Sequence, residues 1–228
     1  MFKGPGPDIP SRSIMAVFDF DGTLTRYDSY LSYLIAHAVA RPARFPQMWA
    51  LPLDVICCKL GLQDNSWLKQ RFLQAVLGGL TAADLRQSTE RFLDRLLANG
   101  LRRKAVDALK AHQSCGHRTV LLSASPALYV QRAAERLGFS DCLCTVAEWD
   151  TGGVLTGCLA GPNCYGEEKV RRLSELVGAE RQAWHIVAYG DHRSDLPLLK
   201  SADAGCLINP SRVLARKAVE ANLRVLYW

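Results

Sequence analysis

The amino-acid sequence predicts an α/β fold in which a doubly wound parallel sheet carries an inserted all-helical block. Beyond residue 100, apolar runs that favour strands alternate with amphipathic stretches that favour helices, as in parallel sheets covered on both faces. Between Tyr27 and Leu97, no strand-like alternation interrupts the helical periodicity. The chain has 228 residues and is 49% hydrophobic, which is enough for one sizeable core with an inserted subdomain.

The first predicted strand is the apolar run at residues 14–18, which is typical of a strand buried on both faces. It ends at two carboxylates, Asp19 and Asp21, followed by a Gly-Thr turn. Residues 1–12 are rich in Gly and Pro and are expected to form a flexible tail. Because ligands of open parallel sheets bind beyond the carboxyl ends of strands, the two carboxylates mark a candidate site.

Apolar residues at helical spacing predict the helices of the inserted block at residues 27–39, 45–60, 66–77 and 82–97. Prolines and glycines separate these segments. Thr81, with Asp84 three residues later, has the pattern of a helix N-cap with an acidic residue in the first turn. We therefore expect a helix to begin directly after Thr81.

The second half of the chain is expected to alternate strand and helix. The predicted strands are residues 117–122, 142–147, 184–189, 204–208 and 223–226, with a hairpin arm at 154–156. The predicted helices are residues 102–114, a segment ending at 137, then 167–177, 196–200 and 213–221. The ends of several parallel strands should therefore meet in one crevice.

Composition and charge exclude several classes of protein. The net charge is +6 and the pI is near 9.0, but no run of four basic residues marks a nucleic-acid surface, so we expect no nucleic-acid partner. The 8 cysteines lack the spacing of zinc sites and are expected to be reduced thiols. No segment resembles a signal peptide or a membrane span, so we expect a soluble, cytoplasmic protein.

Charged and polar side chains follow several of the predicted strands. Asp19 and Asp21 follow the first strand, Ser123 and Asp191 follow two later ones, and Lys169 lies in the first turn of a predicted helix. Neighbouring carboxylates repel one another and favour a hard cation such as Mg²⁺. A carboxylate that attacks, another that moves a proton and a lysine that neutralises charge are the parts that phosphoryl transfer needs.

Four motifs carry a family resemblance: Asp19-Phe-Asp-Gly-Thr, Ser123-Ala-Ser, Gly166-Glu-Glu-Lys and Gly190-Asp-His-Arg-Ser-Asp. With these motifs in this order, the chain resembles the haloacid dehalogenase (HAD) superfamily, specifically its subfamily IB branch that includes phosphoserine phosphatase. The resemblance covers Asp19 to Asp195. It implies a Rossmann-like core, a helical cap and an aspartyl-phosphate phosphatase activity.

The resemblance implies a role for each matched catalytic residue. Asp19 would attack phosphorus and form a phospho-aspartate. Asp21 would protonate the leaving oxygen and then activate water for hydrolysis. Ser123 and Lys169 would bind the phosphoryl oxygens, and Lys169 would also screen the charge of Asp19.

The resemblance also implies a magnesium site. Asp19, Asp191 and the backbone carbonyl of Asp21 would hold the ion. Asp195 would support the metal through water or orient its ligands. Mg²⁺ is therefore the expected cofactor, and a small-molecule phosphomonoester is the expected partner.

Further candidates for substrate contact lie in the loops beside these motifs. Backbone N–H groups of Gly22 and Thr23 would help to bind phosphate, as exposed loop amides do. Ala124, which follows Ser123, is a further candidate for contact with the substrate. Phosphoserine phosphatases usually have two glycines after that serine, where this chain has Ala124 and Ser125, and this departure argues against serine specificity.

In this family, a helical insertion after the first motif closes over the substrate. The resemblance implies a cap at residues 27–99 and a catalytic core at residues 13–26 and 100–228. Asp28 and Arg71 lie near the positions where phosphoserine phosphatases bind the ammonium and the carboxylate of their substrate. The implied substrate is a small phosphorylated metabolite of the phosphoserine or histidinol phosphate type.

Other functions stay open. The apolar stretch at residues 45–62, with basic Arg41, Arg44 and Lys59 around it, is typical either of a cap helix buried against its neighbours or of a surface that admits a lipid phosphate at a membrane. Pro52 and Asp54 interrupt the stretch and favour the buried cap helix. Phosphatidylglycerophosphate is the substrate of a related branch. Asp21 favours a phosphatase over a dehalogenase, but a phosphotransferase or mutase would keep this residue, and a phospho-ligand binding module is a further alternative. The sequence does not determine the oligomeric state.

Overall fold

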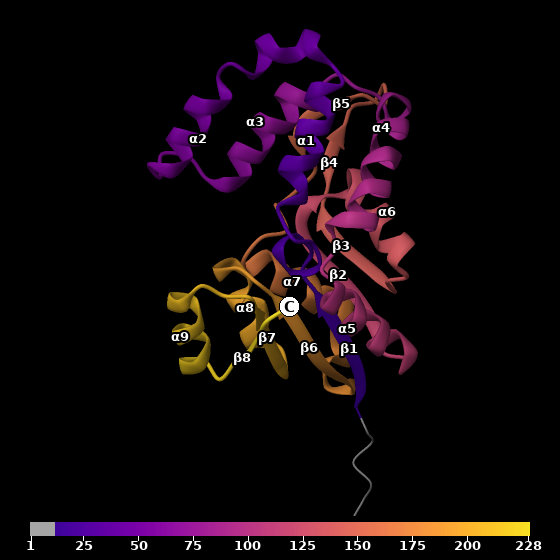
Figure 1. Ribbon diagram of the computed structural model, residues 1–228, viewed down its shortest axis with the longest axis vertical. Coiled ribbons are helices and arrows are strands. Elements are labelled where there is room, and N and C mark those ends of the chain that lie inside the picture. Colours follow the sequence, from indigo (N-terminus) through magenta and orange to yellow (C-terminus); the bar gives the residue numbers. More distant parts are fainter. Residues whose placement is uncertain (1–11) are drawn as a thin grey trace, which may run out of the picture.

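A computed structural model describes residues 12–228, and in it a parallel sheet lies below a block of helices (Figure 1). Within these residues the main sheet has six strands in the order β3-β2-β1-β6-β7-β8, and every neighbouring pair is parallel. The strands are β1 (Ser13–Phe18), β2 (Arg118–Pro126), β3 (Asp141–Thr145), β6 (Trp184–Gly190), β7 (Ala204–Ile208) and β8 (Arg224–Leu226). The sheet extends outward on both sides of β1, so the predicted doubly wound topology is confirmed.

The central strand β1 is buried on both faces of the sheet. Ala16 and Phe18 belong to one hydrophobic cluster, whereas Met15 and Val17 belong to a second one on the opposite face. This arrangement follows from the alternation of side chains along a strand, and it explains why the run is apolar without interruption.

Helices cover both faces of the sheet. On one face pack α5 (Arg103–Ser114) and α6 (Ala127–Leu137), which contribute residues such as Leu109 and Val130 to the cluster that contains Phe18. On the other face pack α7 (Glu167–Val177), α8 (Leu196–Ser201) and α9 (Arg212–Glu220). Short 3₁₀ segments lie at Gly178–Ala183 and Arg193–Asp195, and an irregular turn at Phe20–Leu24 leads from β1 to the helical block.

The helical block consists of α1 (Ser29–Val39), α2 (Leu51–Lys59), α3 (Asn65–Leu77) and α4 (Ala82–Arg95), with a further turn at Leu96–Gly100. Thr81 and Asp84 form a capping box at the start of α4, as predicted. The single helix predicted at residues 45–60 is wrong. The chain forms a 3₁₀ helix at Pro42–Met48 before α2, because Pro46 lacks a backbone N–H and Pro52 is tolerated only in the first turn of a helix.

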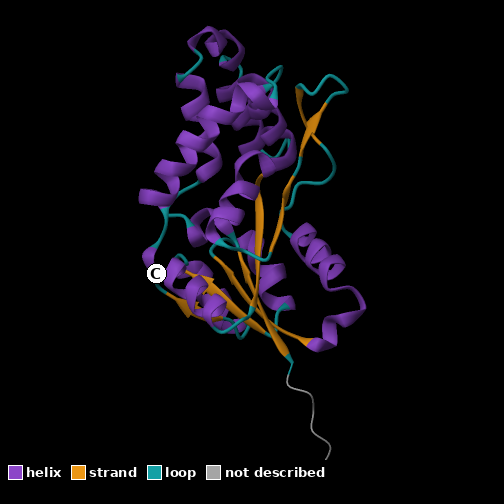
Figure 2. Ribbon diagram, turned by 90° about the vertical axis from the view of Figure 1, so that its right-hand side faces the viewer, coloured by secondary structure: helices purple, strands orange, loops and turns teal. Residues whose placement is uncertain are grey.

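A small antiparallel hairpin from the second half of the chain packs against the helical block (Figure 2). It is made of β4 (Ala147–Trp149) and β5 (Leu155–Leu159). The Gly79 N–H donates to the Leu155 carbonyl at 2.7 Å, and Gly157 passes so close to Gln74 that a Cβ there would lie 2.5 Å from its Cα. The predicted hairpin arm is confirmed, and it tethers the helical block to the rest of the chain.

No helix among residues 12–228 combines the length and the apolar character that crossing a bilayer requires. The flexible tail predicted at residues 1–12 falls almost entirely outside the described residues.

Candidate active site

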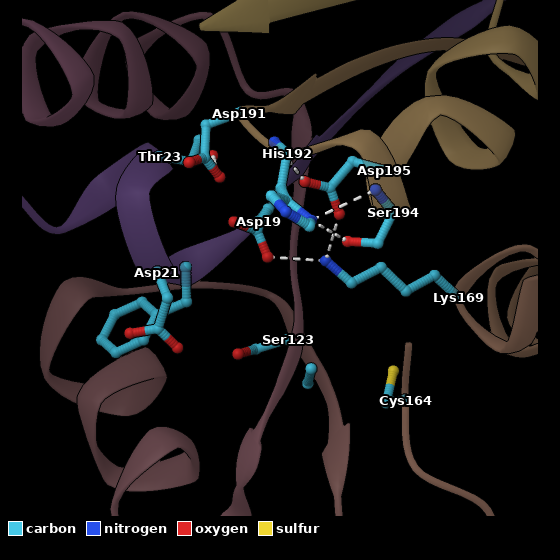
Figure 3. Close-up of polar contacts among 12 residues, drawn as sticks. Asp19, Asp21, Thr23, Ser123, Cys164, Lys169, Asp191, His192, Ser194 and Asp195 are labelled. Atoms are coloured by element: carbon cyan, nitrogen blue, oxygen red, sulfur yellow. Dashed lines mark hydrogen bonds and ion pairs between the residues drawn. The ribbon is translucent and has the colours of Figure 1, made fainter. Parts of the chain in front are cut away.

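The carboxyl ends of β1, β2 and β6 meet at one edge of the sheet. Phe18, the last residue of β1, pairs with Leu121 of β2 and with Tyr189 of β6. Residues just beyond these positions gather around Lys169, as Figure 3 shows. A cavity of about 430 Å³ opens between this edge and the helical block. Its core side is lined by Asp19, Asp21, Ala124, Ser125, Tyr165, Lys169, Asp191, His192, Ser194 and Asp195.

Asp19 and Lys169 form a buried ion pair on this side of the cavity. The Asp19 N–H donates to the Tyr189 carbonyl at 2.9 Å, which holds the residue at the end of β1. Lys169 Nζ lies 2.6 Å from Oδ1 of Asp19 and 2.8 Å from Oδ1 of Asp195. Burial raises the pKa of Asp19, and the charge of Lys169 opposes this rise. Burial alone would lower the pKa of Lys169, but the two carboxylates outweigh it and raise that pKa, so the lysine stays cationic.

Asp19, Asp191 and Asp195 form a cluster suited to a divalent cation. Each offers a carboxylate oxygen, and the three oxygens lie within 4.8 Å of one another. Burial, followed by the charge of Asp195, raises the pKa of Asp191 to about 6, so these carboxylates are held together against their mutual repulsion. Lys169 supplies a single positive charge to the cluster. The donor set, which consists of hard carboxylate oxygens, fits Mg²⁺.

Backbone geometry makes room for the cluster. Gly22 has a φ of +80°, and a Cβ at this position would lie 2.2 Å from Oδ2 of Asp191. Oδ1 of Asp191 accepts a hydrogen bond from Thr23 Oγ1 at 3.4 Å, and Asp195 accepts one from the His192 N–H at 3.0 Å. The turn between β1 and the helical block therefore shapes the position of the carboxylate that follows β6.

The carboxylate of Asp21 has different partners from the cluster. It accepts hydrogen bonds from the Ser29 N–H at 2.6 Å and from Ser125 Oγ at 2.5 Å. Burial raises the pKa of Asp21, and the hydrogen bond from Ser125 opposes the rise. The metal ligand that we expect from Asp21 is its backbone carbonyl. The side chain of Asp21 lies apart from the three clustered carboxylates (Figure 3). A buried carboxyl with a raised pKa is better suited to donate a proton than an exposed aspartate.

The predicted phosphate-binding loop residues are close to the cavity, but most do not line it. Ser123 is buried, and its Oγ accepts a hydrogen bond from the Ser125 N–H at 3.0 Å. Thr23 is buried too, and the Gly22 N–H donates to Thr25 Oγ1 at 3.2 Å, so this N–H is already used inside its own turn. Ala124 does line the cavity.

Of the two residues of the helical block that we expect to contact the substrate, Asp28 lines the cavity and Arg71 does not. Asp28 lines the cavity and also caps α1, where its Oδ1 accepts from the Leu31 N–H at 2.9 Å. Arg71 is not a lining residue, because its guanidinium pairs with Asp54 at 2.9 Å. The structure therefore does not bring Arg71 to the cavity as the sequence led us to expect.

Lys69 of α3 brings a positive charge to the cavity, and it is not among the site residues that the sequence predicts. Its side chain is buried, donates to Asn163 Oδ1 at 2.6 Å and to the Ala124 carbonyl, and lies 5.8 Å from the centre of the Tyr30 ring. Burial lowers the pKa of Lys69 to about 8. A signal for it exists in the sequence, because Lys69 shares a helix face with the apolar residues at 72, 73 and 76.

Ser125 was also missed as a site residue. It lies at the end of β2, where the strand pairing with β3 is irregular, and its hydroxyl contacts Asp21 from 104 positions away in the sequence. The upper wall of the cavity is apolar. It is formed by Leu31 and Leu34 of α1, Val55 of α2, and Leu68 and Phe72 of α3.

Comparison with known sequences places the chain in a family. The family model for haloacid dehalogenase-like hydrolases matches residues 16–200. Protein CicA of Caulobacter vibrioides is 30% identical over 195 residues, which cover 83% of each chain. Probable phosphatase Rv3661 of Mycobacterium tuberculosis is 28% identical over 222 residues, covering 94% of this chain and 75% of that protein. A histidinol-phosphatase of Neisseria meningitidis is 23% identical over 222 residues, covering 93% of this chain and 97% of that protein.

Solved structures share the fold. A protein of unknown function from Bordetella pertussis Tohama I superposes with a TM-score of 0.81 at 23% identity, covering 95% of this chain and 99% of that chain. A substrate-bound phosphoserine phosphatase superposes with a TM-score of 0.63 at 16% identity, covering 94% and 93% of the two chains. The chain therefore belongs to the haloacid dehalogenase-like hydrolase family, in which it is an enzyme of the phosphatase type.

Proposed function

We propose that the protein is a magnesium-dependent phosphatase that hydrolyses a phosphomonoester through a phospho-aspartate on Asp19. One observation carries this proposal. Asp19 lines the cavity, lies 2.6 Å from the buried cation of Lys169, and shares a cation-sized cluster with Asp191 and Asp195. A carboxylate in that position can attack phosphorus while its surroundings neutralise the charge that develops.

In the first step, a carboxylate oxygen of Asp19 attacks phosphorus, and the bond from phosphorus to the leaving oxygen breaks. Asp21 donates its proton to that oxygen, which its raised pKa favours. Lys169 remains charged and offsets the negative charge on the phosphoryl oxygens. Mg²⁺, held by Asp19, Asp191 and the Asp21 carbonyl with support from Asp195, would withdraw charge from the phosphoryl group and orient it.

In the second step, Asp21 accepts a proton from water, and the resulting hydroxide attacks phosphorus. The bond between phosphorus and Asp19 breaks, which releases inorganic phosphate and restores both carboxyl groups. Ser125 supports this step, because its hydrogen bond to Asp21 stabilises the deprotonated carboxylate. Ser123 would contact the phosphoryl group after a small rearrangement at the end of β2. The N–H groups of Gly22 and Thr23 would do so after a similar shift of their turn.

The proposed division of the chain has a catalytic core at residues 13–26 and 100–228 and a cap at residues 27–99. The cavity between them supports this division. Core residues provide its carboxylates and Lys169, whereas α1, α2 and α3 provide five apolar side chains together with Lys69. The β4–β5 hairpin of the core contacts α3 of the cap. Closure of such a cap would exclude bulk water from the reaction.

For the substrate, we propose a small phosphorylated metabolite of the phosphoserine or histidinol phosphate type. Two relatives named phosphoserine phosphatase and histidinol-phosphatase support this proposal. Asp28 in the cavity wall suits an ammonium group. Arg71 is occupied by Asp54, so Lys69 is the cap cation available to an anionic group. The apolar upper wall favours a second candidate, a lipid phosphate such as phosphatidylglycerophosphate. A cytoplasmic location stays a prediction.

The test is phosphate release from a panel of phosphomonoesters, with and without Mg²⁺. The panel contains phosphoserine, histidinol phosphate, sugar phosphates, nucleotides and a lipid phosphate in detergent. We expect Mg²⁺-dependent release that Asp19→Asn abolishes and that Asp107→Asn, at an exposed aspartate of α5, leaves unchanged. Folded Asp19→Asn protein with normal turnover would overturn the proposal.

The same panel separates the remaining alternatives. A phosphotransferase would pass the phosphoryl group to an added acceptor alcohol rather than to water. A binding module would retain phosphate esters without turning them over. Asp21→Asn should accumulate phospho-enzyme or form it slowly, and unchanged rates in both half-reactions would contradict its role.

A further inference from the structure

The outer edge of the helical block exposes a row of large apolar side chains. Trp49, Leu53, Ile56 and Leu60 are exposed by 82%, 65%, 51% and 69%. They are spaced at helical intervals on and beside α2, so they lie within a narrow arc of one helix face. We call these four residues the α2 row. In Figure 1, α2 lies at the left margin of the block with no other element beyond it.

The surroundings of the α2 row are apolar and basic. Phe45 and Leu62 flank the row and are exposed by 47% and 68%. Between residues 29 and 63 the sequence has one acidic residue, Asp54, which is buried and paired with Arg71. Lys59 is the last residue of α2. Arg41 and Arg44 precede α2, and their guanidinium groups donate to the carbonyls of Asp84 and of Gly78. An ordinary solvated helix face would instead be rich in charges of both signs.

We propose that the α2 row docks the protein on the surface of a lipid bilayer that carries anionic headgroups. A surface that exposes Trp and Leu side chains beside basic residues is suited to the boundary between headgroups and acyl chains. The net charge of +6 adds attraction to such a surface. Trp49, the most exposed of the four, would lie at headgroup depth.

The helix that carries most of the α2 row also contributes to the cavity. Val55 of α2 lines the cavity about 100° around the helix from Ile56, and Leu31 of α1 lines it while being partly exposed. A docked α2 would therefore hold the apolar wall of the cavity close to the bilayer. The docking does not depend on the phosphatase activity, so vesicle binding and turnover can fail separately.

A second copy of the chain is a less suitable occupant of this surface. In a two-fold dimer through the α2 row, the basic residues of one copy would face the same basic residues of the other. Anionic headgroups neutralise these charges instead. The comparison of vesicle binding with oligomeric state decides between the two.

The experiment is flotation of the full chain with vesicles of phosphatidylcholine alone and of phosphatidylcholine mixed equally with phosphatidylglycerol. We expect binding to the anionic vesicles that high salt weakens. In Leu53→Ser/Ile56→Ser, the partition onto these vesicles should fall by roughly tenfold or more, because two apolar side chains no longer enter the interface. Trp49→Phe should abolish the blue shift of tryptophan emission that vesicles cause.

The matched control is Val213→Ser/Val219→Ser, which removes two side chains on α9 that are each 69% exposed. This control should bind vesicles as the unmodified chain does. Circular dichroism and the unfolding midpoint show that both double variants are folded. Absence of vesicle binding by the unmodified chain, or equal loss in both double variants, would overturn the proposal. So would a dimer that Leu53→Ser/Ile56→Ser dissociates while no vesicle binding is found.

Discussion

Asp21 owes its chemistry to two hydrogen-bond donors that reach it from separate parts of the chain. Burial raises its pKa, and Ser125 Oγ at 2.5 Å works against burial by stabilising the charged form. The residue therefore holds a proton to higher pH than an exposed aspartate does, and the hydrogen bond from Ser125 favours its release. Asp19 differs, because Lys169 lies beside it and favours its charged form.

This difference predicts the effect of Ser125→Ala. Without the hydroxyl, the pKa of Asp21 rises further, so the acidic form persists to higher pH. Hydrolysis of the phospho-enzyme should then be several-fold slower near neutral pH and should recover as the pH rises. Rapid-quench measurement of dephosphorylation across pH tests this, with Ser125→Thr as the control that keeps a hydroxyl. An unchanged pH profile in Ser125→Ala would contradict the proposed support.

Gly22 shapes the proposed metal site without contributing a ligand to it. A Cβ there would lie 2.2 Å from Oδ2 of Asp191, so Gly22→Ala must displace this carboxylate. We expect Mg²⁺ affinity to fall by roughly 10–100-fold, as for other changes beside metal ligands. Calorimetric titration with Mg²⁺ measures it. Gly116→Ala is the matched control, since Gly116 has a similar φ of +70° with nothing within 4 Å, and equal losses in both variants would indicate a backbone effect alone.

Lys69 gives a third prediction. With a pKa near 8, its charge is lost as the pH rises above that value. If this charge binds an anionic group of the substrate, kcat/KM should fall above about pH 8 in the unmodified enzyme, and Lys69→Arg should preserve activity there. Lys69→Met should raise KM on the order of tenfold, which corresponds to the loss of one charged hydrogen bond. A flat alkaline profile, or a change confined to kcat, would contradict this role.

Among the helices, α1 lines the cavity near its start and carries a buried histidine, His37, near its end. This side chain is buried between Tyr33, whose ring centre lies 4.3 Å away, and Ser88, whose Oγ lies 3.2 Å from Nε2. Within the described residues, Nδ1 of His37 has no hydrogen-bond partner. Burial therefore lowers the pKa of His37 to about 4 from an ordinary value of 6.5.

This shift predicts acid sensitivity of the helical block. Between pH 6.5 and 4 the unfolded chain binds a proton at His37 that the folded chain does not, so the free energy of unfolding decreases as the pH falls through this window. The loss attributable to His37 is at most about 3 kcal/mol and is complete below pH 4. In His37→Phe it should disappear, and denaturant unfolding at pH 8 and pH 4.5 measures the difference. Parallel stability curves for the two proteins would contradict the assignment.

The effect of His37→Phe on stability can be interpreted because Ser88 keeps a hydrogen-bond partner in the variant. Its hydroxyl also donates to the Leu85 carbonyl at 3.0 Å, so replacing the imidazole leaves Ser88 with a partner. Any loss of stability at pH 8 in His37→Phe then reports packing, and the additional loss of the unmodified protein in acid reports protonation.

At the scale of the whole molecule, the carboxylate cluster joins segments from opposite ends of the core. Asp19 follows β1, whereas Asp191 and Asp195 follow β6. A cation bound by all three would stabilise the folded state alone, because the unfolded chain does not hold them together. Mg²⁺ at about one hundred times its Kd should contribute about 2.7 kcal/mol to stability.

For a chain of this length, that stabilisation corresponds to a rise in Tm of roughly 5–10 °C. Differential scanning calorimetry with and without Mg²⁺ measures the rise, which Asp191→Asn should remove and Asp107→Asn should not. Since the pKa of Asp191 is about 6, the rise should shrink below that pH as protons compete with the metal. An equal rise in Asp191→Asn would place the binding site elsewhere.

The doubly wound sheet and its family could be predicted from local sequence. An uninterrupted apolar run specifies a central strand, the Thr81–Asp84 spacing specifies a cap, and the ordered motifs at Asp19, Ser123, Lys169 and Asp191 specify the superfamily. Each of these signals is contained in a few neighbouring residues, whose conformations depend on short-range sterics and hydrogen bonds. Local sequence is therefore sufficient for the fold class and for membership of a phosphatase family.

Tertiary structure alone decided which further side chains complete the site. Lys69 and Arg71 are separated by about 200° around α3, and only the packing of that helix turns the first to the cavity and leaves the second to Asp54. Ser125 meets Asp21, and Leu155 meets Gly79, across long stretches of chain. Such contacts depend on how distant elements pack. Their partners are therefore set by three-dimensional packing and not by any local pattern.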